Sequence, residues 1–208
     1  MTYLGTQPND VKKNTGLYTP SEILQLEKDG HWGGSLELIE EQTTSGAVSF
    51  VDFTDIKENV YDVHYLAFNN VGQDTNNVKL QLQLYESGVL ETASVYQYAS
   101  QLCRASASFV EVKSTSSDFM RLTGNNGNAT AYSDNGYFYG YNFGNSSKYS
   151  FMTFHTNSSD TVGSLNVEFG GNALPQASVV DGFRIKISSG NIQTGSNFKL
   201  YGVKQWVT

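Results

Sequence analysis

Residues 179–208, which read VVDGFRIKISSGNIQTGSNFKLYGVKQWVT, decide the fold class. Apolar and polar residues alternate twice in this stretch, over 183–188 and over 198–201, on either side of a Ser-Gly-Asn break at 189–191. Alternation with a period of two is what an antiparallel strand with one buried face requires. The stretch therefore predicts two strands joined by a turn, and the second strand is expected to complete a sheet.

Similar runs occur earlier in the chain. Residues 61–71 are apolar on both faces, which predicts a central strand, whereas residues 78–85 alternate strictly between apolar and polar. Because the polar segment 72–77 separates these two runs, they are expected to form a hairpin. Residues 94–104 show no clear alternation, so a strand and a short helix both stay open, and an irregular segment is the favoured interpretation.

These runs together predict an all-β protein. The chain holds about ten of them, at a spacing near the 8–12 residues that is typical of sandwiches and barrels. No helical pattern separates the strands, which excludes parallel β-α-β units. A length of 208 residues is enough for one full core. We therefore expect residues 35–208 to form an antiparallel, jelly-roll-like β-sandwich.

A single helix signal precedes the strands. Thr19 suits the N-cap, Pro20 the first helical position and Glu22 the third, which is the capping-box pattern. The helix is expected over 20–29 and is too short to be stable alone, so it must dock on the β-domain or on another chain. We expect residues 1–34 to be an extended arm and helix that act as an anchor, with these candidate contact residues: Leu17, Tyr18, Ile23, Leu24, Leu26 and Trp32.

Charge and hydropathy argue against several classes of protein. The formal net charge is −7 and no run of Lys or Arg is present, which disfavours binding to nucleic acid or to an anionic membrane surface. No apolar run approaches the roughly 20 residues that a membrane-spanning helix needs. The first residues lack the basic and apolar regions of a signal peptide, so synthesis in a cytoplasm without the usual export is expected.

No stretch has the pattern of an active site. The sequence contains neither a nucleophile elbow nor a glycine-rich loop placed before a helix. The three histidines lie far apart and lack ligand spacing: His31, His64 and His155. The single cysteine, Cys103, is expected to be a small buried residue. We therefore predict neither enzymatic activity nor a cofactor.

A calcium site stays open as an alternative. Loop carbonyl groups together with scattered carboxylates can assemble such a site without a local motif, and the candidate carboxylates are Asp134, Asp160 and Asp181. The sequence contains no calcium-loop pattern that would place them together.

An aromatic cluster is the most unusual local feature. Five of the seven residues in 137–143 are aromatic, and a strand that alternates faces must point some of them away from the core. The candidates for an exposed site are Tyr137, Tyr139, Tyr141 and Phe143. Tyr and Phe are enriched at subunit interfaces, so a covered interface or a doubly buried strand is the favoured interpretation. A platform that stacks on a sugar ring is the alternative.

Four segments carry a resemblance to a known family. WGGSLELIEEQ (32–42), SKYSF (147–151), SGNI (189–192) and FKLYGVK (198–204) resemble virion structural proteins of tailed bacteriophages, most closely those of marine phages that infect cyanobacteria and similar hosts. In such proteins a Gly-Thr-Phe-x-Leu-Tyr-Gly ending closes a jelly-roll-like domain. Residues 195–198, Gly-Ser-Asn-Phe, depart from that ending by one inserted residue and a substituted Thr.

The resemblance implies a structural role without catalytic residues. It suggests a component exposed on the virion, in the tail, a fibre or the capsid decoration, anchored by residues 1–34 to a capsid, neck or tail protein. Such proteins assemble as symmetric oligomers, and by analogy we expect a homotrimer. The alternative is a carbohydrate-binding adhesin that recognises a host polysaccharide through Tyr137, Tyr139 or Tyr141.

Overall fold

The computed structural model describes residues 19–28 and 35–204, with no side-chain description for 26–28. The chain divides into two units, Met1–Ser35 and Leu36–Thr208, which are described separately. In the described part of the first unit lies helix α2 (Pro20–Lys28). The described residues of the second unit form β1 (Leu36–Thr43), β2 (Phe50–Phe53), β3 (Val63–Val71), β4 (Leu80–Glu86), β5 (Val89–Leu90), β6 (Tyr96–Arg104), β7 (Val110–Ser117), β8 (Met120–Arg121), β9 (Asp134–Tyr141), β10 (Tyr149–Ser159), β11 (Leu165–Ala177), β12 (Val180–Ile187) and β13 (Asn197–Val203).

Helix α2 begins with the predicted capping box. The Thr19 hydroxyl accepts a hydrogen bond from the backbone N–H of Glu22 at 3.3 Å, and the Glu22 carboxylate accepts one from the backbone N–H of Thr19 at 2.6 Å. These reciprocal bonds satisfy two donors that the first turn leaves open. The helix is described as far as Lys28, and the expected last residue, Asp29, and the predicted stop at Gly30 lie outside the described residues.

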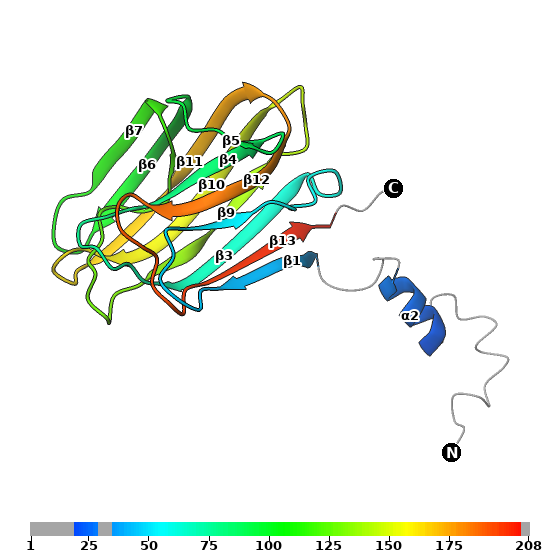
Figure 1. The fold of residues 1–208 in the computed structure, drawn as a ribbon, viewed down its shortest axis with the longest axis horizontal. Coiled ribbons are helices and arrows are strands. Elements are labelled where there is room, and N and C mark those ends of the chain that lie inside the picture. The colour runs from blue at the N-terminus through cyan, green and yellow to red at the C-terminus, as the bar shows by residue number, and fades with distance from the viewer. Residues whose placement is uncertain (1–18, 29–34, 205–208) are drawn as a thin grey trace, which may run out of the picture. The chain divides into compact units, whose positions relative to one another are not determined.

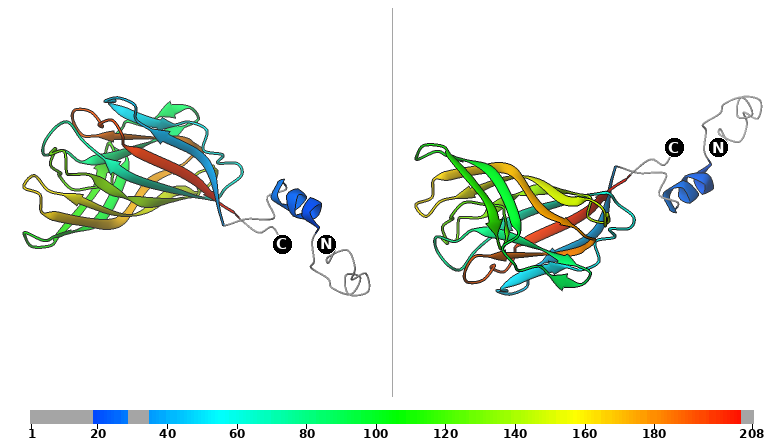
Figure 2. Two further views of the ribbon diagram at one scale, coloured as in Figure 1. Left: turned by 90° about the horizontal axis from the view of Figure 1, so that it is seen from below. Right: turned by 90° about the horizontal axis from the view of Figure 1, so that it is seen from above.

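The strands form two antiparallel sheets that pack as a sandwich, which confirms the predicted fold class (Figures 1 and 2). The large sheet has eight strands in the order β1-β13-β3-β9-β10-β11-β6-β7. The small sheet has five, in the order β2-β12-β4-β5, with β8 also paired to β4. Figure 1 shows the large sheet running from β7 at one edge to β1 at the other.

The path of the chain is that of a jelly roll. Strands β1, β2, β3 and β4 alternate between the two sheets, and β12 and β13 do so again at the end of the chain. The neighbours β1-β13-β3-β9 and β2-β12-β4-β5 are the two four-stranded sheets of that fold. Strands β10, β11, β6 and β7 extend the large sheet beyond β9. We call β1, β13, β3 and β9 the jelly-roll half of this sheet, and the other four strands the extension.

One prediction about a connection was wrong. Strands β3 and β4 belong to opposite sheets, so residues 61–71 and 78–85 do not form a hairpin. The two strands predicted in the final stretch are confirmed as β12 and β13, and β13 completes the large sheet, while β12 belongs to the small one. Alternation shows that a strand has one buried face, but both sheets of a sandwich bury such a face, so the pattern does not identify the sheet.

The expectation that residues 94–104 are irregular was also wrong, because β6 (Tyr96–Arg104) covers most of them. Tyr96 is fully buried, and its hydroxyl donates to the Glu91 carbonyl and accepts from the Leu84 N–H, each at 2.9 Å. A buried tyrosine with both hydrogen bonds satisfied is compatible with a strand interior. A shift in register between Tyr96 and Tyr98 disturbs the alternation at this point.

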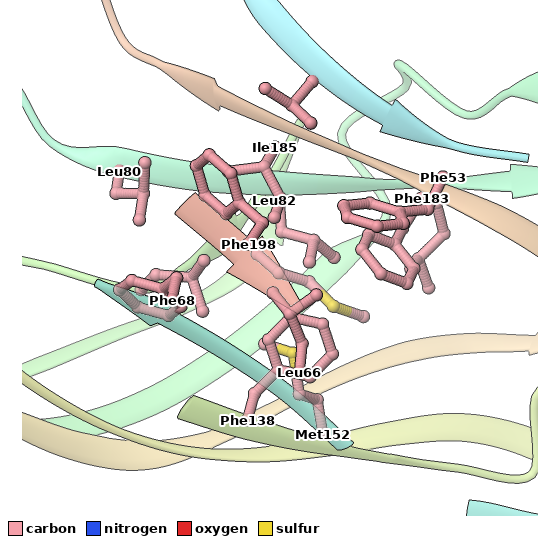
Figure 3. Packing of buried hydrophobic residues seen from close by; sticks show 14 of the residues in the cluster. Phe53, Leu66, Phe68, Leu80, Leu82, Phe138, Met152, Phe183, Ile185 and Phe198 are labelled. Atoms are coloured by element: carbon pink, nitrogen blue, oxygen red, sulfur yellow. The ribbon is translucent and has the colours of Figure 1, made fainter. Parts of the chain in front are cut away.

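The core lies between the two sheets. The jelly-roll half and the small sheet supply most of it, and Met152, Phe154 and Leu174 of the extension complete it. Figure 3 shows aromatic and aliphatic side chains of the two sheets meeting face to face. Phe138 of β9 packs edge-on against Phe183 of β12, with ring centroids 5.5 Å apart, and Phe183 stacks on Phe53 of β2 at 5.0 Å. All three are fully buried, so the two sheets are joined by large apolar contacts.

Candidate functional site

The outer face of the large sheet, which points away from the small sheet, carries the aromatic cluster. Strand β9 alternates faces, so Phe138 is buried in the core while Tyr137 on the other side is 37% exposed. Tyr139 and Tyr141 share the outer face with Tyr137 and are half-buried. The expected division of the cluster between two faces is therefore present.

Cross-strand pairing enlarges this cluster beyond what the sequence indicates. Tyr201 of β13 pairs with Tyr65 of β3, which pairs with Tyr139 of β9. The ring centroids of Tyr65 and Tyr139 are 4.9 Å apart, and those of Tyr65 and Tyr201 are 6.0 Å apart. We call this set the tyrosine face: Tyr65, Tyr137, Tyr139, Tyr141 and Tyr201. Burial and the neighbouring tyrosines raise the pKa of Tyr65, so its phenol stays protonated at neutral pH.

Phe143 is a correction to the predicted set. It is fully buried and stacks on the imidazole of His64 at 5.4 Å. The strand ends at Tyr141, and Asn142 adopts a positive φ of 65°, so the alternation of β9 does not extend to Phe143. Phe143 is therefore a core residue and not part of the exposed face.

A groove lies on the same outer face, over the extension. Its volume is about 770 Å³, within the range of small-ligand sites, and strands β10, β11, β6 and β7 line it. Small residues form its floor: Gly171 of β11 lies between Thr153 of β10 and Ala99 of β6 in the cross-strand register. A Cβ added at Gly171 would meet only the Met152 carbonyl oxygen, at 3.4 Å, so the space above this residue is open.

The walls of the groove combine an aromatic ring with polar side chains. Phe151 of β10 is 45% exposed at one side, and Lys113 and Thr115 of β7 lie at the other. A second hollow of about 320 Å³ adjoins the first and shares Ala99 and Lys113 with it. The groove also borders the tyrosine face, because the Tyr141 hydroxyl lies 3.1 Å from the Thr153 hydroxyl.

The inner face of the extension is mixed: Met152, Phe154 and Leu174 belong to the apolar core, and a polar cluster lies around Glu168. The Arg121 guanidinium donates to the Glu168 carboxylate over 2.6 Å, and both side chains are buried. Ser100 donates to the same carboxylate oxygen at 2.6 Å, and Asn172 bonds the backbone of Arg121 in both directions. A buried charge needs an opposite charge and hydrogen bonds of this kind. We therefore interpret this cluster as a structural element of the fold and not as a candidate site.

Asp134 is a buried carboxylate without a cationic partner in the described part of the chain. Its Oδ1 accepts a hydrogen bond of 2.8 Å from the Asn126 amide, and its Oδ2 has no partner among the described residues. Burial raises the pKa of Asp134 to about 7, although the bond from Asn126 acts in the opposite direction. Asp134 is therefore protonated over much of the acidic pH range.

Neither the histidines nor the carboxylates converge on a metal site in the described residues. His64 is buried, its Nε2 lies 2.8 Å from the Ile56 carbonyl oxygen, and burial lowers its pKa. His155 lies on the outer face beside Tyr137. Asp160 binds backbone N–H groups of its own loop, which contribute to a lowered pKa. Within residues 19–28 and 35–204, no three His, Cys, Asp or Glu side chains lie close enough to hold a metal ion.

The candidate anchor residues are only partly described. Ile23 is half-buried and Leu24 is 50% exposed in α2. Leu17, Tyr18 and Trp32 lie outside the described residues, as does the side chain of Leu26. The described helix α2 is too short to cross a membrane, and no other helix in the described ranges qualifies.

Sequence reasoning missed Tyr65, Tyr201 and the groove. Tyr65 and Tyr201 each lie in a predicted strand, but their meeting with Tyr139 depends on pairing between strands far apart in the chain. Gly170-Gly171, directly after the alternating run 165–169, was the available signal for the groove floor, since glycine in a strand often marks a close approach or an open site. Comparison with protein-family models, curated proteins and solved structures returns no match for this chain.

Proposed function

We propose that this chain is a non-enzymatic structural protein of a tailed-bacteriophage virion, exposed on the particle. The observation that carries the proposal is the tyrosine face, a set of outward rings on a sheet whose other side is already packed against the core. Tyrosine is enriched where protein surfaces meet, because it offers a large apolar area and a hydroxyl group. The resemblance of four sequence segments to phage virion proteins supports the proposal that the particle is a tailed-bacteriophage virion.

Assembly would use two parts of the chain. Residues 1–34 would attach the protein to a capsid, neck or tail protein, with Leu24 of α2 among the contacts because half of its surface is open. The tyrosine face would join copies of the sandwich into a homo-oligomer, for which a trimer remains our proposal. A helix of nine residues gains most of its stability from such docking.

Deletion of residues 1–34 tests the anchor. The truncated chain should remain folded and soluble but should no longer be incorporated into phage particles, as measured by immunoblotting of purified virions. A matched variant, Leu24→Ser in the full chain, should reduce incorporation without changing the circular dichroism of the sandwich. Normal incorporation of the truncated chain would refute the anchor.

Light scattering on the purified full chain tests the oligomer. A stable trimer that becomes monomeric in Tyr65→Ser and Tyr139→Ser would assign the tyrosine face to the interface. An oligomeric mass unchanged by both substitutions would remove this face from the assembly.

Carbohydrate binding is the second candidate function. It is favoured by the combination on the outer face of exposed aromatic rings with hydroxyl groups, such as the Tyr141–Thr153 pair at 3.1 Å. Sugar rings present apolar C–H faces and hydroxyl edges, which match these two kinds of group. In this case the protein would act as an adhesin for a host polysaccharide, and replacing Tyr137, Tyr139 or Tyr141 by Ala would impair attachment to host cells.

A further inference from the structure

The groove over the extension, rather than the tyrosine face, has the shape of a ligand site. The tyrosines lie side by side along a paired sheet, whereas the groove is a recess of about 770 Å³. Its floor is open because Gly171 and the alanines beside it, Ala99 and Ala173, place nothing larger than a methyl group there. Ligand sites are recesses of this size with an apolar surface and a few polar groups.

The groove is elongated along the strands. The first hollow includes Gln97 of β6, and the second includes Gln101 of the same strand. Four residues of a strand span about 13 Å. An occupant in contact with both hollows is therefore a short chain that runs parallel to β6 and β11.

The residues around the groove match an uncharged polyhydroxylated ligand. Phe151 forms one wall of the groove with its partly exposed ring. Gln97, Thr115 and Thr153 place exposed amide and hydroxyl groups around the groove. Among the described residues that line the two hollows, Lys113 and Glu111 are the only ones with charged side chains, and their charges are opposite. A polyanionic ligand would require several cations at this place, because one exposed lysine contributes little.

An extended peptide fits this groove poorly. Peptides that bind along strands use the free backbone groups of a sheet edge. Strands β10, β11 and β6, which form the floor, are each paired on both sides, so their backbone groups are already used in the sheet. A sugar chain does not need such groups, since its hydroxyls bond to side chains.

We propose that this groove binds an extended, uncharged oligosaccharide, with Phe151 stacked on a sugar ring and Gly171 at the centre of the floor. The inference rests on the carbohydrate-binding candidate and places its site in the groove. It does not depend on the tyrosine face, on residues 1–34 or on assembly into a particle.

The experiment titrates the full chain with cellohexaose, maltohexaose, mannohexaose and xylohexaose, with hexagalacturonate as the acidic comparison, and follows backbone amide shifts by NMR. We expect at least one neutral hexasaccharide to bind saturably and to shift the resonances of β6 and β11. Gly171→Gln should fill the groove and weaken binding by roughly tenfold or more, and Phe151→Ala should do so by roughly tenfold. The open space at Gly171 lets the new side chain enter the groove while the fold is kept.

Leu165→Ala is the matched control, because Leu165 lies on the same strand and the same face as Gly171 but outside the groove, with 52% of its surface exposed. It should leave binding unchanged. Lack of binding to every neutral hexasaccharide at millimolar concentration would overturn the inference, as would binding of the acidic sugar alone. If binding is lost in Tyr139→Ala but kept in Gly171→Gln, the sugar binds at the tyrosine face. That result would overturn the groove as the site and keep carbohydrate binding as the function. A change of oligomeric mass in Gly171→Gln would make the groove a protein interface instead.

Discussion

The two halves of the large sheet share a backbone architecture but differ in the side chains that their two faces carry. In the jelly-roll half, apolar rings such as Phe138 fill the inner face, and tyrosines cover the outer face. In the extension, the inner face is polar around Glu168, and the outer face is open over Gly171. The small sheet explains why the inner faces of the two halves differ. Its longer strands lie opposite only part of the large sheet.

Strand β8 shows what the extension faces instead. It has two residues and contacts β6 and β11 as well as pairing with β4. The Asn172 side chain bonds both backbone groups of Arg121, and the Thr156 hydroxyl donates to the Leu122 carbonyl at 2.9 Å. Polar side chains of the extension thus satisfy backbone groups that a longer strand would have paired. The comparison teaches that polar side chains can occupy inward positions where they bond to backbone groups that no neighbouring strand pairs.

The largest effect is expected for Phe138→Ala, which removes a ring from the apolar inner face. The loss should be about 3–5 kcal/mol in the free energy of unfolding, the usual cost of deleting a buried phenylalanine. Tyr139→Ala, the adjacent outward residue, should cost about 1 kcal/mol or less, as substitutions near the surface do. Urea denaturation of both variants measures the difference, and equal losses would contradict the assignment of the two faces.

A somewhat smaller loss is expected for Arg121→Met in the polar cluster around Glu168. This change leaves the Glu168 carboxylate buried without its cation, which should cost about 3 kcal/mol. The double variant Arg121→Met with Glu168→Met should regain most of that loss, because it removes both charges. A double variant as unstable as the single one would show that the pair is not the principal interaction of Glu168.

The smallest effect, counted per pH unit, is expected for Asp134, a buried carboxylate without a cationic partner among the described residues. Because burial raises its pKa to about 7, the folded protein keeps a proton that the unfolded chain releases near pH 4. The stability from this group is complete below about pH 4 and is lost as the pH rises through 7, by at most about 1.4 kcal/mol per pH unit. Asp134→Asn should remove this loss.

The measurement is the difference in unfolding free energy between Asp134→Asn and the wild type, from about pH 5 to about pH 7. Burial lowers the pKa of His64, so the folded protein becomes less stable as the pH falls below the ordinary pKa of histidine. This contribution is the same in both proteins and cancels in the difference. Asp160→Asn is the control, because the pKa of this exposed carboxyl is lowered and it titrates below this range. A difference that does not change with pH would show that Asp134 is ionised throughout.

Local sequence signals predicted much of the fold. The capping box at Thr19 and the central position of β3 were confirmed, because both depend on residues close together in the chain. The predicted hairpin between β3 and β4 failed because alternation does not identify the sheet. Strand β6 was missed where the register shift beside Tyr96 disturbs the pattern.

The candidate sites divide in the same way. The sequence by itself determined that Tyr137, Tyr139 and Tyr141 share one face of a strand, because side chains alternate with a fixed period of two. Only the tertiary structure decided that this face points outward, that Tyr65 and Tyr201 join it, and that Gly171 opens a groove beside it. Those features depend on which distant strands pair and in which register, and a one-residue shift of register would move every one of these side chains to the other face.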